Sequence, residues 1–130
     1  MALFWWAAAA AWWVFMTALS HQRGEATRRV SRTLARDLGA LLPGPDRERL
    51  HTALRKAAHP VVFGVLTLLT GLALRSSGAA APAPGQLAAL GLWCWLDEVT
   101  KLPVAGRHFS WRDVGLNLLG TALAAGLLAL

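Results

Sequence analysis

Ionisable side chains occur beside long apolar stretches of this sequence, where they could exchange protons or hold a charged ligand. Two adjacent carboxylates, Asp97 and Glu98, directly follow the apolar stretch 87–96. A charged side chain inside a hydrophobic membrane segment costs on the order of several kcal/mol unless it is paired, so we expect cations from other parts of the chain to neutralise these two. The predicted polar cluster, a candidate ligand-binding site, contains Lys56, His59, Asp97, Glu98, Arg107, Asp113 and Asn117.

The two adjacent carboxylates are expected to have separate partners. Neighbouring positions on a helix point in directions about 100° apart, so one cation is not expected to face both side chains. Lys56, Arg107 and His59 are the partners that we expect for them.

The residue types in this cluster leave three functions open. We favour a non-enzymatic role, in which the cluster fixes helix packing and binds a polar lipid headgroup or a cell-envelope component. Alternatively, His59 and the three carboxylates could hold a divalent cation or act as acid and base on a lipid-linked substrate, with Lys56 and Arg107 on its phosphate. The third function is that of an oligomeric pore or transporter subunit, alone or with another membrane protein. We assign no catalytic residue, metal ligand or cofactor, because the sequence has no recognised ligand spacing, nucleophile motif or glycine-rich phosphate loop.

The elements that must position this cluster are apolar stretches. Apolar residues make up 55% of the 130 residues and are concentrated in the stretches 2–19, 57–74, 87–96 and 114–130. A helix that is apolar on all sides belongs in lipid or inside a large protein. Crossing the hydrocarbon takes about 20 helical residues, so the third stretch must extend to about residue 104, which places its carboxylates below the membrane surface. We predict a single all-α integral membrane domain, 1–130, with transmembrane helices at about 3–19, 57–75, 85–104 and 112–130.

The basic residues predict how these helices are oriented. Of the 13 Lys and Arg residues, all but Arg75 lie in the first and third connections between the apolar stretches. Short loops rich in Lys and Arg stay in the cytoplasm, so both termini are predicted outside. Residues 1–6 carry no basic side chain, unlike the start of a signal peptide, so we expect the first helix to be retained. Orientation and anionic lipid explain the net charge of +6, and nucleic-acid binding is not expected.

A basic amphipathic helix is predicted at about 25–42, between the first two spans. Val30, Leu34, Leu38 and Leu41 recur at helical spacing, and arginines occupy the other side. Such a helix lies in the membrane surface, with its arginines at anionic headgroups.

The start of the second span has two interpretations. A short helix is expected to begin near Asp46, a suitable N-cap residue, after Pro43, Gly44 and Pro45 end the preceding one. This helix either continues through Pro60 with a kink or ends there, so that the span begins at the proline.

Several short motifs follow one another in a recognisable order. Together they resemble the VanZ-like family of bacterial membrane proteins, from about residue 55 to 124. The motifs are Arg-Lys-Ala-Ala-His at 55–59, Asp97-Glu98, Gly106-Arg107, and Asp113 with Asn117 and Gly120.

The resemblance implies a helical domain in the bacterial cell membrane and a link to glycopeptide (teicoplanin) resistance, and it transfers no established reaction. The chain departs from the family pattern at several positions. Thr100-Lys101 stands where members usually have His-Gln, and Pro60 and Val62 stand where they often have Phe and Glu.

Overall fold

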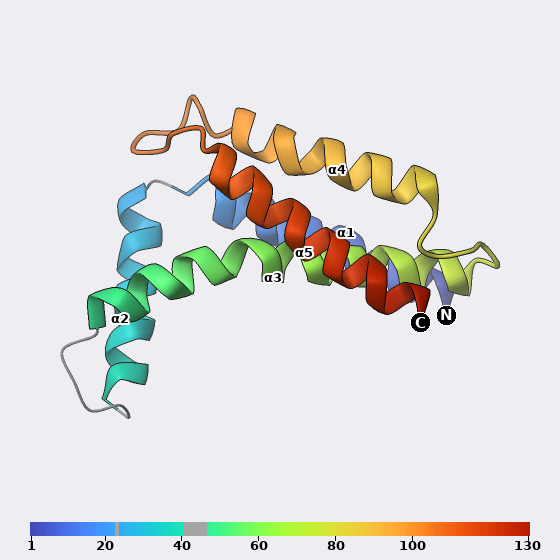
Figure 1. Ribbon diagram of the computed structural model, residues 1–130, viewed down its shortest axis with the longest axis horizontal. Helices are drawn as coiled ribbons and strands as arrows, with labels where there is room; N and C mark the ends of the chain where they lie inside the picture. Colours follow the sequence, from blue (N-terminus) through green and yellow to red (C-terminus); the bar gives the residue numbers. More distant parts are fainter. Residues whose placement is uncertain (23, 41–46) are drawn as a thin grey trace.

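A computed structural model describes residues 1–22, 24–40 and 47–130, and these residues form helices joined by turns, without strands (Figure 1). The all-α prediction is therefore confirmed. Two helices are long and apolar enough to cross a membrane, the first helix and the segment Arg49–Ser76. The arrangement with four spans stays a prediction. The helices are α1 (Ala2–Ser20), α2 (Gly24–Gly39), α3 (Arg47–Ser76), α4 (Pro84–Val99) and α5 (Trp111–Ala129).

Four of the helices form a bundle, and α2 crosses its direction at one end (Figure 1). Within the bundle α3 is central, because both α1 and α5 pack along it and α4 packs mainly on α5. The two chain ends lie together at one end of the bundle, and the turn between α4 and α5 lies at the other end (Figure 1). Helix α2 packs against α3.

Helix α3 runs without a break through Pro60. Of the two interpretations of the sequence, the continuous helix is the one observed. A proline inside a helix leaves the carbonyl four residues earlier without its amide partner. The backbone of Pro60 also meets α5 at a close crossing, because a Cβ atom added to Gly120 would lie 2.6 Å from the Pro60 carbonyl carbon and nearer still to its oxygen. The predicted N-cap Asp46 lies outside the described residues.

Helix α4 ends at Val99, so the prediction that it continues to about residue 104 is wrong. Its 16 residues span about 24 Å at 1.5 Å per residue, less than the roughly 30 Å of a hydrocarbon core. The chain then turns, and Gly106 adopts a positive φ of 75° that favours glycine. The carboxylates at 97 and 98 therefore lie in the last turn of the helix rather than well inside it.

The apolar core is small, and large apolar side chains cover the outside of the bundle. Met16, Phe63, Leu66, Leu90 and Cys94 form the buried cluster. In the two apolar segments named above, only 11% and 28% of the residues are buried within the 18-residue stretch that is apolar enough to cross a membrane. The core helix of a soluble protein would be mostly buried, so these helices present apolar surface to their surroundings.

Helix α2 confirms the predicted amphipathic helix in its described part. It begins at Gly24 and ends at Gly39, and the predicted last turn around Leu41 lies outside the described residues. The side chains of Val30, Leu34 and Leu38 are 53%, 51% and 42% exposed, so this apolar face is left open by the rest of the described chain.

Candidate functional site

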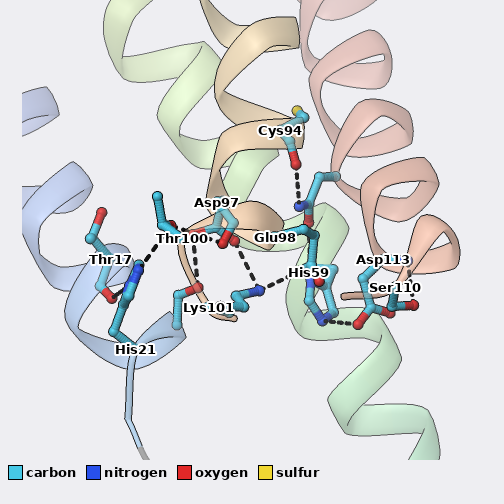
Figure 2. Close-up of polar contacts among 12 residues, drawn as sticks. Thr17, His21, His59, Cys94, Asp97, Glu98, Thr100, Lys101, Ser110 and Asp113 are labelled. Carbon is cyan, nitrogen blue, oxygen red and sulfur yellow. Dashed lines mark hydrogen bonds and ion pairs between the residues drawn. The ribbon is translucent and has the colours of Figure 1, made fainter. Parts of the chain in front are cut away.

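Two carboxylates and one ammonium are buried together where α4 ends. Asp97, Glu98 and Lys101, which we call the ion triad, are 2%, 1% and 4% exposed. The Nζ atom of Lys101 lies 3.0 Å from Oδ2 of Asp97 and also pairs with Oε1 of Glu98 (Figure 2). The expectation that one cation would not face both carboxylates is wrong. Lys101 follows them by four and three residues, about one helical turn, and its long side chain reaches both.

The second oxygen of Asp97 is bonded by α1. Ser20, the last residue of α1, donates from Oγ to Oδ1 of Asp97 at 2.7 Å. A hydroxyl that donates to a carboxylate makes a charge-assisted bond, which is stronger than a neutral one. Both oxygens of Asp97 therefore have partners, and the end of α1 is tied to the end of α4.

A second link joins the same two helix ends through His21. Its Nδ1 lies 2.8 Å from the carbonyl oxygen of Thr17, and its Nε2 lies 2.9 Å from Oγ1 of Thr100. The Thr100 hydroxyl in turn donates to the carbonyl oxygen of Asp97 at 3.1 Å. Because Nδ1 faces a carbonyl, it carries the proton, and the single proton of the Thr100 hydroxyl serves either the Asp97 carbonyl or Nε2 of His21.

On the other side of the triad, α3 and α5 contribute a histidine, an amide and a third carboxylate. His59 Nδ1 lies 3.0 Å from Oδ1 of Asn117, and His59 Nε2 lies 3.5 Å from Oδ2 of Asp113. The amide nitrogen of Asn117 donates to the carbonyl oxygen of Cys94 at 3.4 Å. Asn117 is fully buried, whereas His59 and Asp113 are partly exposed.

The start of α5 is fixed by a side-chain cap. Oγ of Ser110 accepts from the backbone N–H of Asp113 at 3.2 Å, as the Ser-x-x-Asp pattern predicts. This bond positions Asp113 in the first turn of α5, where the partial positive charge of the helix N-terminus favours a carboxylate.

His59, Glu98 and Asp113, which we call the ligand group, come together from three helices (Figure 2). One possible ligand atom from each of them lies within 4.8 Å of the others. Oε2 of Glu98 is buried and has no hydrogen-bond partner among the described residues. The arrangement offers one imidazole nitrogen and two carboxylate oxygens to a shared position.

Arg107 lies in the turn between α4 and α5 and holds the end of α1. Its Nε donates to the carbonyl oxygen of Gln22 at 3.0 Å and its Nη2 to that of Leu19 at 3.3 Å. Carbonyls at a helix C-terminus lack partners within the helix, so a guanidinium is well placed there.

Arg107 also shares the electrostatic field of the site. Burial of its guanidinium is the main cause that lowers its pKa, and the positive charge of Arg55 lowers it further. The charges of Glu98, Asp97 and Asp113 act in the opposite direction. Arg107 therefore contributes positive charge beside the three carboxylates.

The model of the VanZ/LLP1 family matches residues 4–130 of this chain. The chain belongs to the VanZ/LLP1 family. No curated protein and no solved structure matches it significantly. The match includes α1 and α2 as well as the motifs between residues 55 and 124, so the helix that supplies Ser20 is part of the family's domain.

In this VanZ/LLP1 protein the structure brings six of the seven predicted residues to one end of the bundle. Lys56 differs, because its side chain is exposed on α3, and Lys101 provides the ammonium in its place. Lys101 stands where the family pattern has Gln. Its spacing of three and four residues from the two carboxylates was the signal that could have identified it. Ser20 and His21 also join the site, and their position just after the first apolar run gave no comparable signal.

Proposed function

We propose that this VanZ/LLP1 protein is a multi-pass protein of the bacterial cell membrane, in which α1, α3, α4 and α5 cross the bilayer. The apolar exposed surface of the bundle supports this proposal, because lipid would cover it. The helix α4 is short, so its polar end lies at the inner membrane boundary and the turn that follows completes the crossing. The retained first helix is supported by the bond from Ser20 to Asp97, which cleavage would remove.

The proposed orientation has both termini outside and the polar end of the bundle inside. The two chain ends and the turn around Ser77 share one end of the bundle (Figure 1). The turn with Arg107 and His108 and the basic helix α2 lie at the other end (Figure 1). This distribution agrees with the retention of Lys-rich and Arg-rich loops in the cytoplasm.

Labelling of single cysteines tests the orientation in intact cells. With Cys94→Ala as background, Ser77→Cys should react with a membrane-impermeant maleimide, and His108→Cys should react only after the cells are opened. Reaction of both positions in intact cells, or of position 108 alone, would contradict the proposed orientation.

Helix α2 is proposed to lie in the inner membrane surface. Its open apolar face contains Val30, Leu34 and Leu38, while its arginines line a groove on another side. Apolar residues at the acyl boundary and arginines at the headgroups are typical of helices that bind anionic lipid. The groove is lined by Glu25, Arg28, Arg29, Arg32, Thr33 and Arg36.

Depth-dependent quenching in liposomes tests this placement of α2. A fluorophore on Leu34→Cys should be quenched by lipids that carry a nitroxide in the acyl chain, and a fluorophore on Arg32→Cys should be quenched by aqueous iodide. Equal quenching of both positions by iodide would show that α2 stands away from the membrane.

The polar end is proposed to bind the polar headgroup of a lipid or of another cell-envelope component. The observation that carries this proposal is the burial of three charged side chains at the end of an apolar bundle. Packing alone does not need such charges, since well-packed apolar residues are often as stable as a buried ion pair. We propose that this binding contributes to glycopeptide resistance of the teicoplanin type, and membership in the VanZ/LLP1 family supports this proposal.

The test compares growth with and without the protein under glycopeptide and membrane-active antibiotics. We expect the wild type to change survival and Asp97→Asn to lose this effect, with Asp37→Asn on exposed α2 as the matched control. The yield of folded Asp97→Asn protein in detergent distinguishes a binding role from a structural role. Normal yield with a lost phenotype supports binding, and a fall in yield supports a structural role. No survival effect of the wild type under any of these antibiotics would contradict the resistance link.

A further inference from the structure

The ligand group combines side chains that are far apart in sequence. His59 comes from α3, Glu98 from α4 and Asp113 from α5, and their nearest ligand atoms lie within 4.8 Å of one another. Glu98 is buried, while His59 and Asp113 are partly exposed. A site with this profile has a closed inner side and an accessible outer side.

Asn117 determines which nitrogen of His59 carries a proton. Its amide nitrogen donates to the carbonyl oxygen of Cys94, so its Oδ1 is the atom that faces the imidazole. An amide oxygen only accepts hydrogen bonds, and therefore Nδ1 of His59 must be the donor. A neutral ring then has its lone pair on Nε2.

That lone pair faces a carboxylate. Nε2 of His59 lies 3.5 Å from Oδ2 of Asp113. Two electron pairs at this distance repel each other unless a proton or a cation lies between them. Two ligands of a tetrahedral zinc ion, with bonds of about 2.0–2.1 Å, are roughly 3.4 Å apart, so the observed separation already fits a shared ion.

Glu98 distinguishes a cation from a proton. Its Oε1 pairs with Lys101, while its Oε2 is buried without a hydrogen-bond partner among the described residues. A buried polar atom without a partner is costly and rare. A proton on His59 would satisfy the pair with Asp113 and leave Oε2 of Glu98 unchanged. A divalent cation among the three groups would satisfy all of them.

We propose that His59, Glu98 and Asp113 bind a divalent transition-metal ion, with Asn117 orienting the imidazole. One imidazole and two carboxylates are suitable ligands for zinc, manganese or ferrous iron. A metal-bound histidine commonly donates its other ring N–H to an oxygen, which is the role of Asn117 here. Three protein ligands leave at least one coordination position for water or an anionic group. This inference goes beyond the proposed headgroup binding and does not depend on it.

Titration of the purified full-length protein with Co²⁺ and Zn²⁺ tests the site. After chelator treatment in detergent, the wild type should bind one Co²⁺ per chain, with a visible absorption band that Zn²⁺ abolishes. His59→Gln and Asp113→Asn should each weaken binding by about tenfold or more, since even residues that only orient a ligand have effects of about 10–100-fold. Exposed His108→Gln and Asp37→Asn are the matched controls and should retain the affinity of the wild type.

A thermal measurement keeps the test independent of the yield of each variant. An ion that binds only the folded protein raises its Tm, and we expect this rise in the wild type and in both controls. Asp113→Asn keeps the backbone N–H that Ser110 caps, so it should fold and lose the rise. A folded wild type that retains no Co²⁺ and shows no rise in Tm would overturn the proposal, as would His59→Gln that binds as tightly as the wild type.

Discussion

The polar side chains at the two ends of the bundle differ in their partners and in their burial. At the end that carries the chain termini, polar side chains pair with neutral groups near the surface. Exposed Arg75 donates to the carbonyl oxygen of Ala81 at 3.1 Å and also to that of Leu128, and Trp6 donates to Ser77 at 3.1 Å. The bonds to Ala81 and Ser77 are exposed, so water could replace these two partners and neither bond is essential to the fold.

At the opposite end, charges are buried and depend on one another. Asp97, Glu98 and Lys101 are almost fully removed from the surface, and Ser20 completes the bonds of Asp97. Removing one member of a buried ion pair leaves an uncompensated charge, which is far more costly than the loss of a surface bond. The comparison indicates that the stability of the polar end depends strongly on individual partners.

The largest loss of stability is expected from a substitution in the ion triad. Lys101→Met should lower the free energy of unfolding by about 3–5 kcal/mol, because two buried carboxylates lose the ammonium that pairs with both of them. Arg75→Met at the other end should cost less than about 1 kcal/mol, since its acceptors are neutral carbonyls and its bond to Ala81 is exposed. Thermal unfolding in detergent measures both variants, and equal losses would remove the difference between the two ends.

The next largest loss of stability is expected from a substitution at the crossing of α3 and α5. Gly120→Ala places a methyl group against the backbone of Pro60, which cannot move like a flexible side chain. We expect a loss of about 1–3 kcal/mol or more from overpacking. Gly115→Ala and Gly126→Ala on the same helix have open space and should be neutral or stabilising. Unfolding temperatures of the three variants test this, and a neutral Gly120→Ala would show that the helices are further apart.

A smaller effect is expected where α1 joins the polar end. Ser20→Ala removes the hydroxyl that donates to Asp97 at 2.7 Å. A hydrogen bond to a charged group contributes about 1.5–3 kcal/mol, and partial exposure of this bond places the loss near the lower value. Exposed Ser76→Ala is the control. Chemical unfolding in mixed micelles measures the stability of both variants. If Ser20→Ala is as stable as Ser76→Ala, Ser20 has no role in the site.

The smallest loss of stability is expected at the end of the bundle that carries the chain termini. Trp6→Phe keeps an aromatic ring and removes the N–H that donates to exposed Ser77. We expect a loss of about 0.5 kcal/mol or less, because water replaces the lost donor to the exposed Ser77 hydroxyl. A loss comparable to that of Ser20→Ala would mean that the two ends do not differ as described. Thermal unfolding of the two variants side by side gives this comparison.

Long apolar runs were sufficient to predict four of the helices, since burial of apolar surface does not depend on which neighbours provide it. Both ends of α1 and α5 lie close to their predicted positions, and so does the last residue of α3, which begins ten residues before the predicted span. The end of α4 does not, because the prediction used the thickness of a membrane, whereas the chain turns after Val99 so that Lys101 can reach back to the carboxylates.

The candidate site was predictable in composition and less so in its pairing. Polar residues next to apolar runs stand out in the sequence, because such groups are costly in a membrane segment unless they are paired or functional. Here they are Asp97, Glu98, His59, Asp113 and Asn117. Lys56 has a suitable charge to pair with the carboxylates, but nothing in the sequence shows which way its side chain points from α3. Three residues on, the imidazole of His59 faces α5.

The sequence by itself determined the helices, their amphipathic or apolar character and the polar residues that needed partners. These properties follow from local backbone propensity and from spacing along one helix. Only the tertiary structure decided which polar groups pair across helices, for example His59 with Asn117 and Ser20 with Asp97. Those pairs depend on the rotation and crossing of each helix, and residues such as Gly120 set that geometry through contacts that no single helix contains.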